Sequence, residues 1–212
     1  LASASPRRKD ILSRAWSGRL KVIPSGMHEG NSKTGELASA YAVRLAAAKA
    51  LSQEGESEIN LVLGADTVVE LDGKVMSKTD THEEAVEVLK MLRGSSHTVT
   101  TGLMIAANGF SEIVSGYESS VVHMRQYLDT EIEEYVASGQ PFDKAGGYAI
   151  QDSKFAPVQD LDGCHLNVVG LPLCRLFELL RDLGTGVEQL LKLYSCTSCR
   201  TAVGEGDGVA AI

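Results

Sequence analysis

The sequence has no long hydrophobic run and no surplus of basic residues. None of its apolar stretches approaches the roughly 20 residues that a membrane-spanning helix needs, and no signal peptide is recognisable. Lysine and arginine number 20 against 28 aspartates and glutamates, so the formal net charge of the 212 residues is −8. This balance argues against a general nucleic-acid binder, which usually has a basic surplus. We therefore expect a cytoplasmic protein that binds neither membrane nor nucleic acid, with any anion site a local basic cluster.

Cysteine is scarce as well. Four cysteines in a chain of this length do not suggest the disulfide framework of a small secreted domain, so we expect reduced thiols. Two of them, Cys196 and Cys199, form a lone CxxC, which is at most half of a tetrahedral zinc site. Two interpretations stay open. The two cysteines are incidental thiols in a flexible tail, or they are part of a zinc site completed by a second subunit or by further sequence.

Helical and extended patterns alternate along residues 1–184 without repeats, and residues 185–212 are expected to form a flexible tail. The predicted strands cover residues 60–71, 97–107, 112–125 and 156–161. The predicted helices begin at Pro6, cover 36–53, lie between Thr81 and Gly94 and between Thr130 and Gly139, and cover 168–183. The order of elements predicts one α/β domain with a mixed sheet, flanking helices and a central cleft.

Local signals refine these elements. Capping boxes at Thr81 with Glu84 and at Thr130 with Glu133 predict two helix starts. The strand over 60–71 is expected to be interrupted at 64–67, with Asp66 near a strand end.

The segment LASASPRRKDIL places positively charged residues at the N-terminus of a predicted helix. Ser5 and Pro6 predict a helix start, with a hydroxyl cap followed by proline at the first helical position. The next residues, Arg7–Lys9, are cations at the end of a helix that already carries about half a positive charge. Without a ligand these cations repel one another, so removing one of them is not expected to lower stability.

Asp66 lies in an otherwise apolar stretch, where a carboxylate is expensive to bury unless it is paired or bound to metal. It either caps a strand or turn, or acts as a metal ligand or general base. Lys49, Lys78 and Lys144 are each compatible with a solvated surface position. The segment 143–147, with two glycines, suits close backbone approach to a ligand.

Four segments carry a resemblance to a known family: LASASPRR, GADTVVELDGKVMSK, YVASGQPFDKAGGYAIQ and NVVGLP. In this order they resemble the Maf family of nucleoside triphosphate pyrophosphatases over residues 1–184. The resemblance implies a twisted mixed sheet, two lobes around a deep cleft, and a fold related to the inosine triphosphate pyrophosphatases. It also implies cleavage between the α and β phosphates with a divalent cation (Mg²⁺, Mn²⁺ or Co²⁺), and a homodimer as a family-level expectation.

The resemblance assigns roles to individual residues. Asp66 matches the family's proton acceptor and, with Glu29, would hold the metal. The remaining positions would bind the substrate: Ser3, Ser5, Arg7, Arg8, Lys49, Thr67, Lys78, Lys144 and Gln151. A triphosphate at the helix start would compensate the cations of the opening segment.

Arg7, Thr67 and Gln151 are similar to the branch of the family that acts on dTTP and UTP. Two other functions stay open: a house-cleaning pyrophosphatase for purine or modified nucleotides such as 7-methyl-GTP, and a non-catalytic nucleotide-binding regulator of septum formation. The sequence departs from the family pattern at His28, Thr79 and His165, which could alter metal affinity and base choice.

Overall fold

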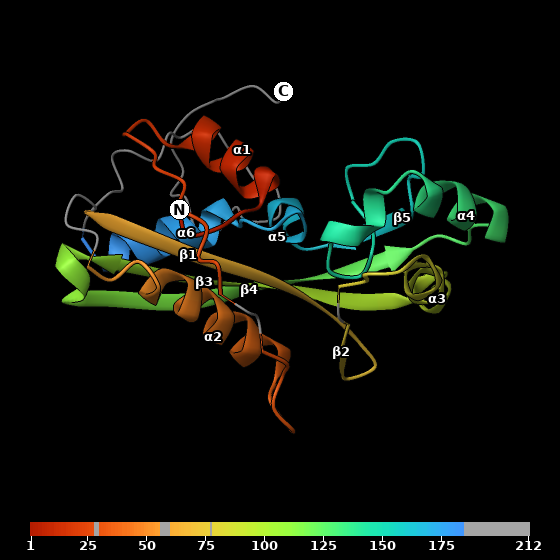
Figure 1. The fold of residues 1–212 in the computed structure, drawn as a ribbon, viewed down its shortest axis with the longest axis horizontal. Coiled ribbons are helices and arrows are strands. Elements are labelled where there is room, and N and C mark those ends of the chain that lie inside the picture. Colours follow the sequence, from red (N-terminus) through yellow and green to blue (C-terminus); the bar gives the residue numbers. More distant parts are fainter. Residues whose placement is uncertain (28–29, 56–59, 77, 185–212) are drawn as a thin grey trace.

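The computed structural model describes residues 1–27, 30–55, 60–76 and 78–184 (Figure 1). The predictions for Glu29 and for the 185–212 tail lie outside these ranges. The described helices are α1 (Pro6–Ala15), α2 (Ala38–Leu51), α3 (His82–Leu92), α4 (Asp129–Ala137), α5 (His165–Val169) and α6 (Leu173–Asp182), with 3-10 turns at Asn108–Phe110 and Gln140–Asp143. The strands are β1 (Leu61–Leu71), β2 (Lys74–Met76), β3 (Ser96–Ala107), β4 (Glu112–Met124) and β5 (Val158–Asp162). Within the described ranges, no helix has the length and apolar character to cross a bilayer.

The five strands form one sheet in the order β2-β1-β3-β4-β5, and every pair is antiparallel. The α/β class is confirmed, but the parallel pairing expected of a mixed sheet does not occur among the described strands. The connections explain this difference. Glu70 near the end of β1 pairs with Thr98 near the start of β3, so the chain passes through β2 and α3 without returning to the other end of the sheet. A three-residue turn then joins β3 to β4.

Local signals were confirmed at some element boundaries and wrong at others. Thr81 and Glu84 form the predicted reciprocal capping box at the start of α3. The box predicted at Thr130 is wrong, because the N-cap of α4 is Leu128, two residues earlier, and Glu131 accepts the backbone N–H of Leu128 at 2.7 Å. Arg125 holds the same carboxylate at 2.7 Å and so fixes this register.

Two further expectations are corrected. The helix predicted over 168–183 is two helices, since Gly170, with φ of 120°, and Pro172 separate α5 from α6. The interruption expected at 64–67 is absent, because β1 runs unbroken from Leu61 to Leu71.

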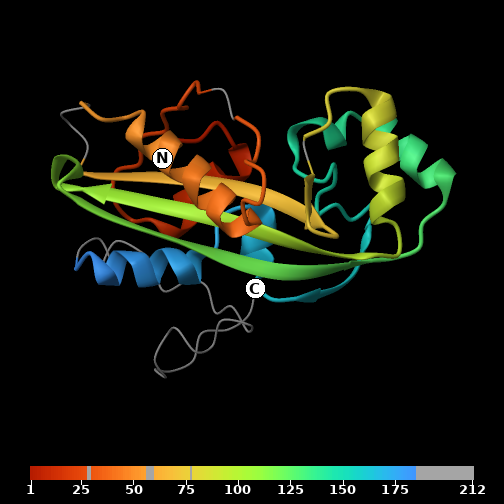
Figure 2. The ribbon, with the colours of Figure 1, turned by 90° about the horizontal axis from the view of Figure 1, so that it is seen from below.

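Helices cover both faces of the sheet, with α2 and α6 on opposite sides (Figure 2). Two glycines let α2 approach closely. A Cβ on Gly64 would lie 2.1 Å from the carbonyl oxygen of Ala46, and one on Gly102 would lie 2.3 Å from the carbonyl carbon of Ala42. Apolar residues of α1 and α6 share one buried cluster with β1 and β3 on the other face. The sheet is therefore sandwiched at this end.

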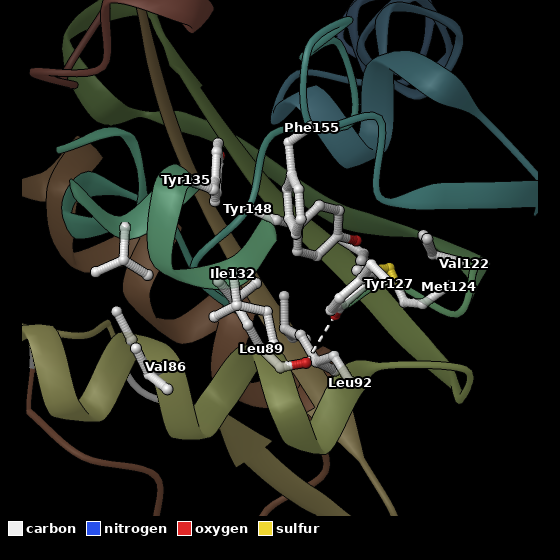
Figure 3. Close-up of a cluster of buried hydrophobic side chains, with 14 residues drawn as sticks. Val86, Leu89, Leu92, Val122, Met124, Tyr127, Ile132, Tyr135, Tyr148 and Phe155 are labelled. Carbon is white, nitrogen blue, oxygen red and sulfur yellow. Dashed lines mark hydrogen bonds between the residues drawn. The ribbon is translucent and has the colours of Figure 1, made fainter. Parts of the chain in front are cut away.

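A separate cluster of buried side chains joins α3, α4 and the other end of the sheet (Figure 3). Tyr127 donates its hydroxyl to the carbonyl oxygen of Leu89 at 2.7 Å, and the Tyr135 and Phe155 rings stack with centroids 4.4 Å apart. Tyr148, from the loop after α4, belongs to this cluster. The cluster therefore anchors the segment that the sequence singled out as glycine-rich.

Candidate active site

A cavity of about 250 Å³ lies along β1. From Val69 to Leu71, one edge of β1 is paired with β2. Near the start of β1, the carbonyl oxygen of Leu63 accepts the backbone N–H of Ala2 at 2.8 Å. The cavity is lined by residues of the stretch between these two contacts and by the segments around it. All ten predicted site residues within the described ranges line it: Ser3, Ser5, Arg7, Arg8, Lys49, Asp66, Thr67, Lys78, Lys144 and Gln151.

Asp66 is the central residue of β1 and is only 5% exposed. It therefore caps neither a strand end nor a turn, and its expected place near a strand end is corrected. Strand alternation puts its side chain on the face that Gly64 presents to α2, where it forms a buried ion pair with Lys49. A buried carboxylate is costly unless its charge is compensated, and the Lys49 ammonium provides that compensation.

The N-terminus of α1 is built as the sequence predicts. Ser5 is the N-cap, and its hydroxyl accepts the backbone N–H of Arg8 at 3.4 Å, with Pro6 at the first helical position. The charge problem is solved differently from the expectation, because Arg8 turns inward and is only 8% exposed. One cation of the basic cluster is therefore hydrogen-bonded within the protein itself.

The Arg8 guanidinium donates hydrogen bonds to oxygens of three described residues. Nε donates to the Gly170 carbonyl oxygen at 2.8 Å, Nη1 to Ser3 Oγ at 3.2 Å and Nη2 to Thr67 Oγ1 at 2.9 Å. Gly170 has φ of 120°, and a Cβ there would lie 3.2 Å from Thr67 Oγ1. Arg8 therefore joins α1, β1 and the α5–α6 connection, while Arg7 is half-buried in the cavity wall.

The loop after α4 forms another part of the wall. Gly146 and Gly147 have φ of 72° and 67°, which glycine adopts without strain, and a Cβ on Gly146 would lie 3.2 Å from Val69. Backbone pairing between Lys78 and Ala145 fixes this loop beside the segment that follows β2. Lys144 is buried and donates to the Gln140 carbonyl oxygen, so the simple picture of a solvated lysine is wrong for it, as it is for Lys49.

The lining combines charge with apolar surface. The described residues of the lining include five cationic side chains and one carboxylate, in a protein whose net charge is −8. Sequence reasoning assigned no role to the apolar members of the lining, which include Val69, Val99, Tyr148, Ala149, Ile150, Val168 and Val169. Their one sequence signal was position, because most of them fall inside the AGGYAIQ and NVVGLP segments. Such a lining suits a polyanion that carries an uncharged ring.

Tyr148, which lines the cavity, is hydrogen-bonded to the buried side chain of His97. The Tyr148 hydroxyl and His97 Nε2 are 2.7 Å apart, and the two rings meet edge to face. Burial, followed by the charge of His123, lowers the pKa of His97 to about 4, so His97 is neutral near pH 7. Burial also raises the pKa of the Tyr148 hydroxyl, which stays protonated.

Among the described residues that line the cavity, one side chain offers a carboxylate to a divalent cation. Asp66 offers a carboxylate, the ligand that hard cations prefer, and Mg²⁺ commonly needs only one or two carboxylates together with substrate phosphates and water. Among the described residues, no group of three or more histidine, cysteine, aspartate or glutamate side chains could hold a metal ion. The donor set therefore fits a metal that arrives with its substrate better than a closed structural site.

Several named proteins are similar to most of this chain. A protein named dTTP/UTP pyrophosphatase from Pelotomaculum thermopropionicum is 40% identical over 188 residues, which cover 88% of this chain and 97% of that protein. Proteins of the same name from Dehalococcoides mccartyi and Geobacter metallireducens are each 41% identical, over 187 and 184 residues; the matches cover 87% of this chain in both cases and 81% and 95% of the relatives. The model of the family described as Maf-like protein matches residues 1–183, so this chain belongs to that family.

Proposed function

We propose that this protein hydrolyses dTTP and UTP to the nucleoside monophosphate and pyrophosphate. The observation that carries the proposal is one cavity whose described lining combines five cations and a buried carboxylate with apolar side chains. The cations suit a triphosphate, which carries about four negative charges near neutral pH, and the apolar wall suits a base. The names of the relatives support the same reaction and the same substrates.

In this proposal, Asp66 orients the attacking water and accepts its proton, directly or as a metal ligand. The Lys49 ion pair holds the carboxylate in one place at the centre of β1, which favours a fixed attack geometry. A divalent cation, held by Asp66 with Glu29, would supply positive charge to the phosphate oxygens when bound. Arg7, Lys78 and Lys144 would stabilise the negative charge that builds up on the departing pyrophosphate.

Base recognition would rest on the remaining polar residues. Gln151 is exposed in the cavity wall and has both a hydrogen-bond donor and an acceptor, which suits the O4 and N3–H groups of uracil and thymine. Arg7 and Thr67 would narrow the space available to a larger base. A homodimer and a cytoplasmic location stay predictions of the family resemblance and of the sequence.

The test is release of pyrophosphate from the common nucleoside triphosphates and from 7-methyl-GTP, each with Mg²⁺, Mn²⁺ and Co²⁺. Pyrophosphate rather than orthophosphate should appear, because cleavage falls between the α and β phosphates, and dTTP and UTP should give the highest kcat/KM. The Asp66→Asn variant is the control for contaminating phosphatases. Faster turnover of purine nucleotides or of 7-methyl-GTP would contradict the pyrimidine preference. If the wild-type protein releases pyrophosphate no faster than the Asp66→Asn variant, the proposed enzymatic activity is contradicted.

A further inference from the structure

The loop after α4 contributes two chemically different parts to the cavity wall. Lys144 lies before the glycine pair Gly146–Gly147 and brings an ammonium group, whereas the segment 148–151 lies after the pair and carries no charge. An ammonium group attracts phosphate oxygens, and uncharged side chains suit the uncharged portion of a nucleotide. The part before the glycines therefore suits phosphate groups, and the uncharged segment 148–151 suits the nucleoside.

Backbone contacts hold the part before the glycines. The backbone N–H of Lys144 donates to the Pro141 carbonyl oxygen at 3.1 Å, and the backbone N–H of Gly147 donates to the Lys144 carbonyl oxygen at 3.1 Å. Ala145 pairs with Lys78 in an isolated bridge. These contacts fix Lys144 through the backbone of its own loop and through the segment that follows β2.

Two buried tyrosine hydroxyls hold the uncharged segment 148–151. The hydroxyl of Tyr135, on α4, accepts the backbone N–H of Ala149 at 3.2 Å. The hydroxyl of Tyr148 lies 2.7 Å from Nε2 of His97, on β3, and shares a hydrogen bond with it. Tyr135, Tyr148 and His97 are all buried, so water competes little for these bonds. One hydrogen bond to this segment therefore comes from α4 and another from β3.

The glycine pair makes these separate contacts necessary. Gly146 and Gly147 have φ of 72° and 67°, and without a Cβ their backbone reaches more conformations than that of other residues. A rotation at the pair would move the uncharged segment 148–151 relative to Lys144. The two hydrogen bonds oppose such a rotation, so they hold this segment at a fixed place relative to the ammonium group.

We propose that His97 and Tyr135 are positioning residues that fix the uncharged segment 148–151 and thereby raise the affinity for the nucleoside portion of the substrate. This inference rests on the proposed function, which supplies the nucleotide. Neither side chain is among the described residues that line the cavity, so each acts through the loop. Both bonds reach the loop beyond Gly147, so binding of phosphate at Lys144 depends on them much less.

Tyr148→Phe tests the inference, because phenylalanine keeps the ring in the cavity wall and removes the hydroxyl that reaches His97. Calorimetric titrations with UMP and with pyrophosphate, each with Mg²⁺, compare the two parts of the wall. The dissociation constant of UMP should rise by about five- to tenfold, the size expected of one hydrogen bond, and that of pyrophosphate should not change. Tyr135→Phe, which removes the acceptor for the Ala149 N–H, should act in the same way and replaces Tyr148→Phe if that variant does not fold.

Tyr127→Phe is the matched control. Tyr127 is buried in the same cluster, but its hydroxyl donates to the Leu89 carbonyl oxygen at 2.7 Å rather than to the loop. This variant should lose stability without a change in either dissociation constant. Equal weakening of UMP and pyrophosphate binding in Tyr148→Phe and Tyr135→Phe would show a general loss of structure and overturn the inference.

Amide hydrogen exchange, measured by NMR, separates this inference from the proposed function because it needs no nucleotide. The Ala149 N–H should exchange faster by about tenfold or more in Tyr135→Phe and Tyr148→Phe, while the Gly147 N–H keeps its wild-type rate. Unchanged exchange of the Ala149 N–H in both variants would overturn the inference alone. Failure of the wild-type protein to release pyrophosphate from dTTP or UTP would contradict the proposed function instead.

Discussion

Replacing Arg8 by alanine should destabilise the unliganded protein, although it removes a positive charge from the positive end of a helix. The variant loses a buried, charged donor that serves the Gly170 carbonyl, Ser3 and Thr67. Hydrogen bonds from charged groups contribute about 1.5–3 kcal/mol each and are not additive. Because water can enter the space left behind, we expect a total loss of about 3 kcal/mol. For a domain of this size that corresponds to a fall in Tm of roughly 6–12 °C.

Thermal and urea unfolding, followed by circular dichroism without nucleotide, measure this effect. Arg14→Ala is the control on the same helix, because Arg14 is exposed and its ion pair with Asp10 spans one turn. Such surface pairs contribute about 0.5 kcal/mol or less. An Arg8→Ala protein that melts within a degree of the wild type would refute the structural role of Arg8. Relief of repulsion at the helix N-terminus would then be the dominant effect.

Three further outcomes are expected. Asp66→Asn should lower kcat, measured by pyrophosphate release, by about 10²–10⁴-fold and leave nucleotide binding, measured by calorimetry, intact. Near-normal turnover at saturating metal would show that Asp66 has no part in the mechanism. Gln151→Ala should lower kcat/KM for dTTP and UTP by about tenfold with smaller losses for slow purine substrates, whereas equal losses for all nucleotides would place Gln151 at the phosphates. Because burial lowers the pKa of His97 from 6.5 to about 4, the unfolded chain binds a proton that the folded protein does not as the pH falls through this window. Stability should therefore decrease between these pH values by up to about 3 kcal/mol, and His97→Gln should flatten the pH dependence of the urea midpoint.

The sequence alone predicted features whose interactions close within a few residues. The Ser5 cap, the Thr81–Glu84 capping box and the left-handed Gly139 after α4 are all present, since each depends on a hydrogen bond to a backbone group three residues away. The ten cavity residues were selected through the family resemblance rather than through local pattern. Their motifs are far apart in the chain, and no spacing rule joins residue 3 to residue 151.

Tertiary structure decided how those residues are used. The partner of Asp66 is Lys49, on a helix that two glycines admit to the face of the sheet. Arg8 bonds to residues 59 and 162 positions away, so sequence reasoning saw only its charge and its place at the helix start. His97 carries no motif signal at all, although it bonds to the hydroxyl of Tyr148. Local backbone preferences determine where helices begin and end, whereas the direction of a buried hydrogen bond depends on which distant strand or helix supplies the other atom.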